Sequence, residues 1–192
     1  NADGHEPRDT ETFSPAHAEF LVSCEIELRL ETNLSETQVD RMVQLLARSD
    51  NLNLSSRRYD KSSFMAGLSP SSTWIAGTCR DRFGDYGLVL AARTVINESI
   101  LEVEDLVVSC RVAEKAIENA FFEWLRTGGV GIKPRRVAAA FIPSPKNAPI
   151  EKSLRQCGFK PDDEDITMWI DGSIPVPASD IVRSVDRSQV SD

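Results

Sequence analysis

Two acids and a thiol lie along one segment whose pattern predicts a β-strand. Glu102 and Glu104 alternate with apolar residues, and Cys110 follows at the end of the segment, just before a predicted helix. A carboxylate on a central strand is a candidate general base, and a cysteine at the start of a helix is a candidate nucleophile. Acids on the solvated face of a strand and a buried structural thiol fit the same pattern. The residues alone leave both interpretations open.

A second group of charged side chains is concentrated in the segment RDRFGDYGLV, residues 80–89, where a hairpin turn is predicted. Glycine and aspartate already favour such a turn, so the remaining charges need another explanation. One explanation is that they pair with one another in water, where each pair contributes less than about 1 kcal/mol. The other is a surface that contacts a partner, formed by Arg80, Arg82, Phe83 and Asp85, which is what the family resemblance described below implies.

Composition and charge exclude several classes of protein. The chain has 22 Lys and Arg against 30 Asp and Glu, a net charge of -8, which disfavours a general nucleic-acid-binding protein because phosphates repel an acidic surface. Its two histidines, His5 and His17, lie in a polar N-terminal segment, so we expect no metal site and no histidine-based triad. Four scattered cysteines without Cys-x-x-Cys spacing predict reduced thiols and a cytoplasmic protein. No apolar run approaches the length of a membrane span.

The spacing of apolar residues predicts an α/β (α+β) protein with one mixed, mostly antiparallel sheet and helices on both faces. In chain order, the expected elements are a strand over 24–30, a helix after the capping box of Ser35 and Gln38, a short helix over 61–68, strands over 73–80, 86–96 and 99–110, a helix over 113–125, a strand over 135–143, a helix over 148–157 and a strand over 165–171.

The ends of the chain differ in composition from its middle. We expect residues 1–19 to be a linker, residues 20–172 to be the domain and residues 173–192 to be a C-terminal extension, because both end segments are polar. Within the domain, the apolar face of the 113–125 helix should pack on the sheet. The helical set is Ala113, Ala116, Ile117, Ala120, Phe121 and Leu125, and the sheet set is Val107, Val137, Ala139 and Phe141.

The segment KNAPIEKSLRQCGF ends in Gly158 and Phe159, and Asn147 lies eleven residues before that glycine. Together with the order of elements, this spacing resembles the GNAT N-acetyltransferase fold, which has three layers. Further segments resemble one branch of that fold, the C-terminal domain of FkbH-like proteins: NLNLSSRRY, RDRFGDYGLV, SCRV and PSPKNAP. The resemblance covers about residues 24–170.

The resemblance to the GNAT fold implies a cofactor site. In that fold the pyrophosphate of acyl-CoA lies on free N–H groups at a helix N-terminus, through an Arg/Gln-x-x-Gly-x-Gly/Ala loop. The matching residues here are Arg111, Val112, Ala113, Lys115 and Ala116, and the spacing above adds Asn147. The glycine position is occupied by Glu114, whose carboxylate would crowd and repel a pyrophosphate.

A second departure from the family concerns proton transfer. Many members of the fold place a tyrosine seven residues after the asparagine, where its hydroxyl protonates the leaving thiolate. That position here is Leu154. With two positions replaced, the resemblance implies either a non-catalytic GNAT-like scaffold or an acyltransferase with an unusual site. Acyl-CoA and phosphopantetheine are the candidate cofactors, and neither is assigned.

The FkbH-like resemblance also implies partners in polyketide or related biosynthesis. Proteins of that family join the GNAT-like domain to a haloacid-dehalogenase-type domain, which loads a glyceryl unit onto an acyl carrier protein. The segment DEDIT, residues 163–167, matches the letters of a dehalogenase motif but follows a loop instead of a strand, so we expect the loading half outside this chain. Arg57 and Arg58 would contact the carrier protein or a phosphopantetheine phosphate, unless they are ordinary surface side chains.

Overall fold

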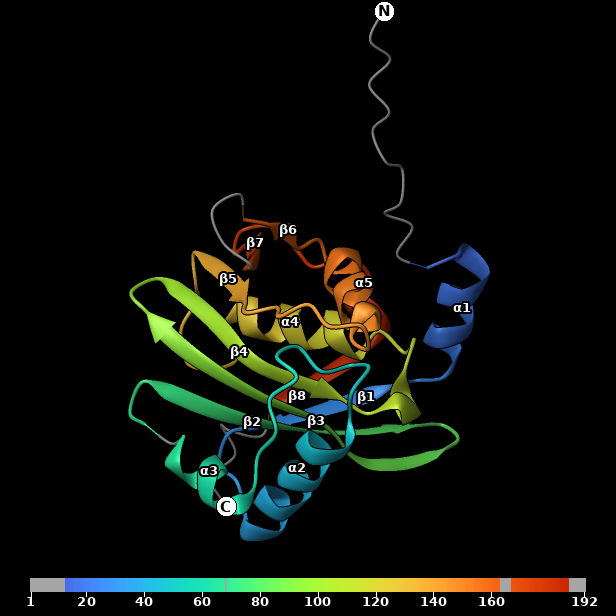
Figure 1. Ribbon diagram of the computed structural model, residues 1–192. Coiled ribbons are helices and arrows are strands. Elements are labelled where there is room, and N and C mark those ends of the chain that lie inside the picture. The colour runs from blue at the N-terminus through green and yellow to red at the C-terminus, as the bar shows by residue number, and fades with distance from the viewer. Residues whose placement is uncertain (1–12, 68, 163–166, 187–192) are drawn as a thin grey trace, which may run out of the picture.

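A mixed sheet of eight strands runs through the computed structural model, which describes residues 13–67, 69–162 and 167–186 (Figure 1). The strand order is β6-β7-β5-β4-β3-β2-β1-β8. The strands are β1 (Glu27–Glu31), β2 (Ser72–Asp81), β3 (Gly84–Asn97), β4 (Ile100–Val108), β5 (Arg136–Ala139), β6 (Lys160–Pro161), β7 (Met168–Asp171) and β8 (Arg183–Asp186). Because only the β4–β5 and β1–β8 pairs among these are parallel, the predicted mostly antiparallel sheet is confirmed.

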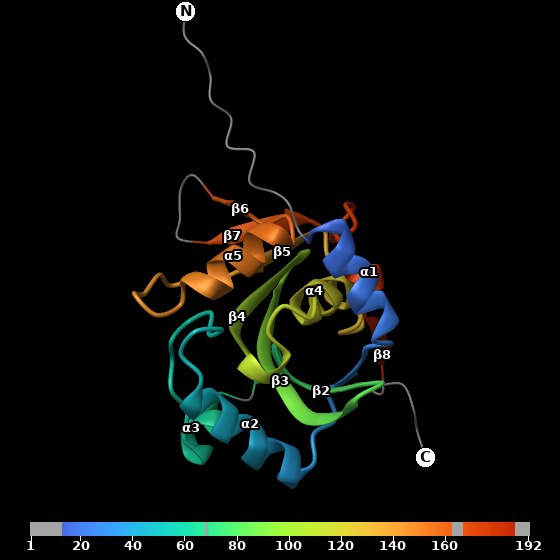
Figure 2. The ribbon, with the colours of Figure 1, turned by 90° about the vertical axis from the view of Figure 1, so that its right-hand side faces the viewer.

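Helices cover both faces of this sheet, as predicted (Figures 1 and 2). The helices are α1 (Pro15–Ser23), α2 (Glu36–Arg48), α3 (Lys61–Ala66), α4 (Ile117–Thr127) and α5 (Ala148–Gln156), with single 3-10 turns η1 (Cys110–Val112) and η2 (Ser179–Ile181). α2 begins at the expected capping box, in which Ser35 accepts from the backbone of Gln38. On its buried side, Met42 and Leu46 belong to a cluster with Trp74 and other residues of the sheet. The α2 and α3 layer therefore has its own apolar contact with the sheet.

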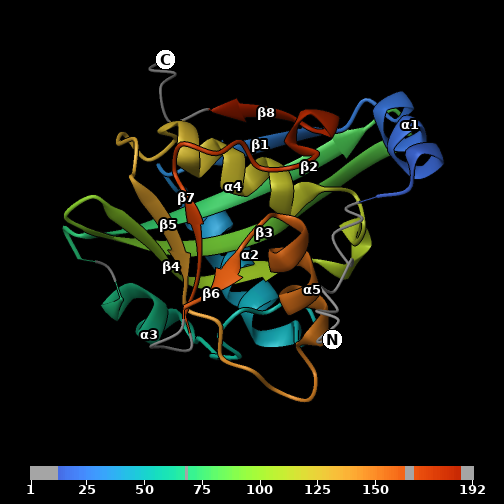
Figure 3. The same cartoon turned by 90° about the horizontal axis from the view of Figure 1, so that it is seen from above.

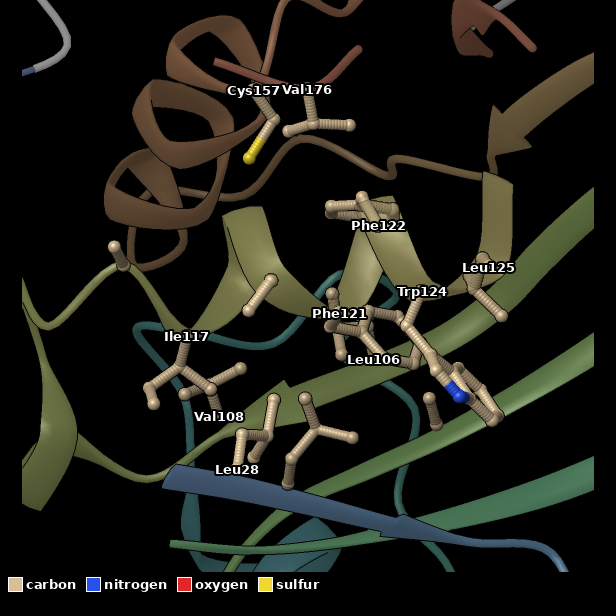
Figure 4. Packing of buried hydrophobic residues seen from close by; sticks show 14 of the residues in the cluster. Leu28, Leu106, Val108, Ile117, Phe121, Phe122, Trp124, Leu125, Cys157 and Val176 are labelled. Atoms are coloured by element: carbon tan, nitrogen blue, oxygen red, sulfur yellow. The ribbon is translucent and has the colours of Figure 1, made fainter. Parts of the chain in front are cut away.

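The larger core lies on the opposite face, where α4 crosses the sheet (Figure 4). Phe121 is fully buried, and its ring centroid lies 5.3 Å from that of Phe122 and 6.5 Å from that of Trp124. Figure 4 shows Leu28, Leu106 and Val108 on the strands beneath this helix. Burial of several aromatic side chains gives α4 an extensive apolar contact with the sheet.

Two expected core positions are wrong. Ala113 is exposed, because α4 begins only at Ile117 and residues before it turn through left-handed backbone. Val107 belongs to the cluster under α2, while Leu106 and Val108 face α4. A register shift between Arg93 and Thr94 in the pairing of β3 with β4 explains this exchange, since a β-bulge reverses which residues of the following segment face each side.

The expected linker and extension both contain elements of the fold. Pro15 begins α1 after the N-cap Ser14, and this short helix was not expected because its apolar residues do not follow a helical periodicity. β8 continues the sheet beyond residue 172, because Arg183 pairs in parallel with Glu27 (Figure 3). Most of the DEDIT segment lies outside the described residues, as does His5.

Several features are absent from residues 13–67, 69–162 and 167–186. They contain no helix that is long and apolar enough to cross a membrane. They also contain no group of three or more His, Cys, Asp or Glu side chains that could hold a metal ion. The four cysteines are free thiols, and Cys24, Cys79 and Cys157 are buried while Cys110 is exposed.

Candidate functional site

The two central parallel strands separate at their carboxyl ends, and a loop of the same chain fills the gap between them. β4 pairs with β5 up to Val103 and Ala139, and the N–H of Ala140 still donates to the carbonyl of Val103 at 3.0 Å. Beyond this point the backbone partners come from residues 52–54, which we call the wedge segment. The gap at the carboxyl ends of parallel strands is where α/β sheets commonly bind ligands.

The wedge segment is hydrogen-bonded to both sides of the gap. On the β4 side, Leu54 N donates to Leu106 O at 2.8 Å, and Val108 N donates to Leu52 O at 2.9 Å. On the other side, Ile142 N donates to Leu54 O at 3.1 Å. The backbone groups of β4 that face the gap are thus satisfied by the protein itself.

Asn147 holds the wedge segment from the start of α5. Its side-chain amide is fully buried and donates to Asn53 O at 3.1 Å and to Ile142 O at 2.9 Å, while its oxygen accepts from Ser144 N at 2.7 Å. From its spacing, this residue was predicted to contact a cofactor. In the structure its hydrogen-bonding capacity is used almost completely by the chain itself.

The loop before α4 has the backbone conformation that glycine residues usually adopt. Glu114 has φ +61° and Ala116 has φ +57°, both in the left-handed region, and they occupy the Gly position and the Gly/Ala position of the predicted pyrophosphate loop. The carbonyl of Glu114 accepts from His17 Nε2 of α1 at 3.2 Å. The expected loop geometry is therefore present although its glycines are not.

The other loop residues point in different directions. Val112 is fully buried in the core, and Lys115 donates to the Asp81 carboxylate at 3.0 Å, away from the cleft described next. Arg111 turns toward α2, with Nε donating to Ser109 Oγ at 3.1 Å and Nη2 donating to Leu88 O at 3.1 Å. Of the predicted cofactor contacts, only Ala113 and Ala116 line that cleft.

A cleft of about 670 Å³ lies between the start of α4 and α5, and we call it the α4–α5 cleft. The loop before α4 contributes Cys110, Ala113, Glu114 and Ala116 to its lining, and α5 contributes Lys152 and Ser153. Leu154 does not line the cleft, because its side chain is fully buried in the core. Residue 154 therefore lacks a hydroxyl, and its side chain also lies in the core and not in the cleft.

Glu118 is a site residue that was not predicted from the sequence. It lines the α4–α5 cleft with only 4% of its surface exposed, and burial raises the pKa of its carboxyl although Ser153 hydrogen-bonds to it. It also lies at helical spacing from Phe121 and Leu125, within the apolar stripe of α4. An acid in such a stripe is the signal that could have identified it. An acid with a raised pKa in the lining of a cleft is a candidate for proton exchange with a bound group.

The two predicted carboxylates of β4 lie away from this cleft. Glu102 and Glu104 are half-buried, and neither lines the α4–α5 cleft. Glu104 forms an ion pair with Arg93 at 2.5 Å. Cys110, the predicted nucleophile, is exposed on the rim of the cleft, so the alternative of a buried structural thiol is wrong.

A buried acid next to Glu104, Asp105, organises the segment that follows the wedge. Its side chain is only 2% exposed and accepts from Ser55 Oγ and Tyr59 OH at 2.6 Å each. Arg93 Nε donates to it at 3.1 Å. Burial and this neighbouring carboxylate raise the pKa of Tyr59 to about 12. The network ties residues 55–59 to β4.

The two basic residues of that segment have internal partners. The guanidinium of Arg57 lies 3.7 Å from Asp105. Arg58 donates to the carbonyls of Leu46 and Ala47 at 3.1 Å and 2.7 Å, at the C-terminal end of α2. A cation at that end satisfies free carbonyls and the helix dipole.

The charged hairpin is held together mainly by Asp81, whose side chain is fully buried. Its carboxylate accepts from Phe83 N at 2.8 Å and from Tyr86 OH at 2.8 Å, in addition to Lys115. Asp85 accepts from Gly87 N at 2.7 Å, within the same turn. Most of the polar character of this hairpin therefore serves its own conformation.

The remaining side chains of the expected partner surface differ in exposure. Arg80 donates to both carboxylate oxygens of Glu27 at 3.1 Å, and hydrogen bonds from Arg80 and Arg29 lower the pKa of that carboxyl. Arg82 donates to Ser23 O at 3.2 Å and lies 5.4 Å from the ring of Phe83. Phe83 itself is 68% exposed. An exposed aromatic ring beside a guanidinium is the part of the hairpin that its internal contacts do not explain.

Comparison with known proteins identifies the fold. No protein-family model and no curated protein matches the chain. Solved structures do, at low sequence identity. The ribosomal-protein-S18-alanine N-acetyltransferase from Escherichia coli is 12% identical with a TM-score of 0.52, over 77% of this chain and 95% of that one. The spermidine/spermine N-acetyltransferase SpeG from Vibrio cholerae is 12% identical with a TM-score of 0.51, over 80% and 95%. A putative GNAT-family acetyltransferase from Desulfovibrio desulfuricans is 12% identical with a TM-score of 0.54, over 77% and 99%. The predicted GNAT fold is thereby confirmed.

Proposed function

We propose that this chain is a non-catalytic GNAT-fold domain of an FkbH-like protein in the cytoplasm. In this role it docks an acyl carrier protein beside a haloacid-dehalogenase-type, glyceryl-loading domain of the same polypeptide. The observation that carries the proposal is the wedge segment, which lies in the gap between the central parallel strands and occupies the backbone hydrogen-bonding groups of β4 there. A ligand that extended into this gap would have to replace several protein hydrogen bonds.

Two carboxylates beside the α4–α5 cleft support the same function. Glu114 stands at a glycine position of the expected loop, and the side chain of Glu118 lines the interior of the cleft. A pyrophosphate brought into this cleft would meet the negative charge of Glu114 and an acidic side chain at Glu118, where a binding site needs donors. Asn147 is already bonded to the wedge segment and offers little to a cofactor.

The docking surface that we propose is the exposed part of the hairpin, Arg82 and Phe83. An aromatic ring flanked by a guanidinium is typical of interface anchors, and Val22 of α1 is also exposed, next to a cleft that includes Arg82. Arg80 is left out of the tested surface because its ion pair with Glu27 makes it part of the fold.

Two titrations by calorimetry test this proposal. The first adds acetyl-CoA to the purified chain, and we expect no binding, whereas micromolar affinity would overturn the non-catalytic assignment. The second adds an acyl carrier protein and, separately, the loading domain. We expect Arg82→Glu and Phe83→Ala to weaken association with one of them at least tenfold, while Arg155→Glu on the exposed face of α5 leaves it unchanged. Equal affinity of all variants would rule out the hairpin as the docking surface.

An active acyltransferase is the second candidate, and one observation favours it. The left-handed backbone at Glu114 and Ala116 keeps the geometry of a phosphate-binding loop beside an open cleft of about 670 Å³. The variant Glu114→Gly separates the candidates. If it binds acetyl-CoA while the natural chain does not, the side chain alone blocks the cofactor. If neither binds, the wedge segment or the cleft shape excludes it.

A further inference from the structure

A second cleft, of about 730 Å³, lies on the other side of Cys110 between α2 and the sheet. One wall is a polar stripe of α2, in which Thr37, Arg41, Gln44 and Arg48 follow one another at helical spacing. The opposite wall consists of Tyr86 and Leu88 of β3 with Ser109, Cys110 and Arg111. We call this the α2 cleft.

Three guanidinium groups face this cleft without an acidic partner. Arg41 and Arg48 make no hydrogen bond or ion pair with any residue that the structure describes. Arg111 is held by the neutral acceptors Ser109 Oγ and Leu88 O, so its position is fixed while its charge is not compensated. The one acid in the lining, Asp40, pairs with Lys61 at 2.9 Å.

This arrangement is unusual for the molecule. The chain has eight more acids than Lys and Arg residues, as its net charge of -8 records, and many of its arginines pair with them, including Arg29, Arg80, Arg93, Arg126 and Arg155. Three cations that converge on one cleft repel one another, and an anion between them would remove that cost. The forked donors of arginine match the oxygens of a phosphate in particular.

We propose that the α2 cleft binds a phosphate group, either inorganic phosphate or the phosphate of a small phosphomonoester. Arg41 and Arg48 on α2 and Arg111 on η1 bind the phosphate oxygens from opposite walls. The hydroxyls of Thr37 and Ser109 lie in the same lining and can donate to remaining oxygens. Leu45 and Leu88 offer apolar surface to the carbon skeleton of a monoester. The site is independent of the proposed docking function, since it uses neither the hairpin tip nor the α4–α5 cleft.

Binding to the full chain is tested by calorimetry at constant ionic strength with two probes, inorganic phosphate and glycerol 3-phosphate. Sodium chloride and sodium acetate are the controls for nonspecific charge effects. We expect saturable binding of at least one phosphate probe, weakened at least tenfold in the double variant Arg41→Gln/Arg48→Gln. Both side chains are exposed and make no hydrogen bond or ion pair with the described residues, so the variant should fold normally. Arg155→Gln, which removes an exposed arginine of α5, should bind like the natural chain.

The two probes also identify the source of the phosphate. Tighter binding of glycerol 3-phosphate assigns the site to a phosphomonoester, and equal or weaker binding assigns it to inorganic phosphate. Amide chemical shifts locate the bound anion: changes at Arg41 and Arg111 are expected. Changes confined to Ala116 and Lys152, at the α4–α5 cleft, would overturn the proposal. Unchanged affinity in the double variant, or no binding of either probe, would also overturn it.

Discussion

The side-chain amide of Asn147 donates to the backbone carbonyl of Asn53 at 3.1 Å and so joins the start of α5 to the wedge segment, 94 residues earlier in the chain. The same amide donates to Ile142 O, on the opposite side of the gap. One side chain therefore connects the wedge segment to the chain on the β5 side of the opening.

Replacing Asn147 with alanine should lower the free energy of unfolding by about 2–4 kcal/mol, because buried carbonyls and an N–H lose their partner. Denaturant titration measures the change, and hydrogen exchange at the Leu54 amide should accelerate. Asn51→Ala is the matched control, since Asn51 is exposed, and its effect should stay below about 0.5 kcal/mol. Equal effects of the two substitutions would contradict the role assigned to Asn147.

Glu114→Gly should stabilise the protein by about 0.5–1 kcal/mol, because glycine adopts the left-handed backbone without the cost borne by other residues. A helical position would give the opposite sign. Glu98→Gly is the matched control: Glu98 has φ +55° in the turn between β3 and β4, far from the α4–α5 cleft. Both variants should gain thermal stability, and only Glu114→Gly has any route to altered acetyl-CoA binding. A loss of stability in both would refute the argument from backbone strain.

Glu118→Gln should be more stable than the natural chain at neutral pH but equally stable below about pH 4. Burial raises the folded-state pKa of Glu118 above its ordinary value of 4.5, so the unfolded chain releases this proton at a lower pH than the folded chain. Stability is then lost as pH rises from that ordinary value through the folded pKa. Denaturant titrations at pH 4 and pH 7 measure the difference. The exposed Glu19→Gln variant is the matched control for the substitution itself.

Phe121→Ala should cost about 3–5 kcal/mol of unfolding free energy, because the substitution leaves a large cavity between α4 and the sheet. Phe83→Ala removes the same side chain from the exposed hairpin tip, where the cost should be within about 0.5 kcal/mol. Thermal and chemical unfolding of both variants checks the pair. A cost below 1 kcal/mol at Phe121 would place α4 outside the main core.

Sequence patterns correctly predicted the elements that are determined by residues close together in the chain. The capping box of Ser35 and Gln38 fixes the start of α2, and alternation along 73–96 fixes the β2–β3 hairpin. α4 was expected to start at Ala113, because apolar spacing does not record the left-handed conformations of Glu114 and Ala116. Val107 was assigned to the wrong face because the bulge opposite Arg93 depends on strand pairing.

The candidate site was harder to predict than the fold because its contacts join distant parts of the chain. Asn147 was selected by its spacing, but its partner Asn53 is known only from the tertiary structure. No pattern in the sequence of the wedge segment indicates that it pairs with β4. Glu118 could have been recognised from the sequence, because it is an acid within the apolar stripe of a helix. The burial of Asp105 could not, because the β-bulge interrupts the alternation of apolar and polar residues at that point.

The parallel pairing of β1 with β8 also constrains how the protein forms. Glu27 cannot meet Arg183 until nearly all of the described chain has been synthesised, so the outer edge of β1 remains unpaired while the ribosome extends the polypeptide. Closing so large a loop is slow, which places the docking of β8 late on the folding pathway. During that interval the exposed N–H and C=O groups of β1 can pair with another nascent chain. Yield during expression should therefore respond to translation rate and to chaperones that shield open strand edges.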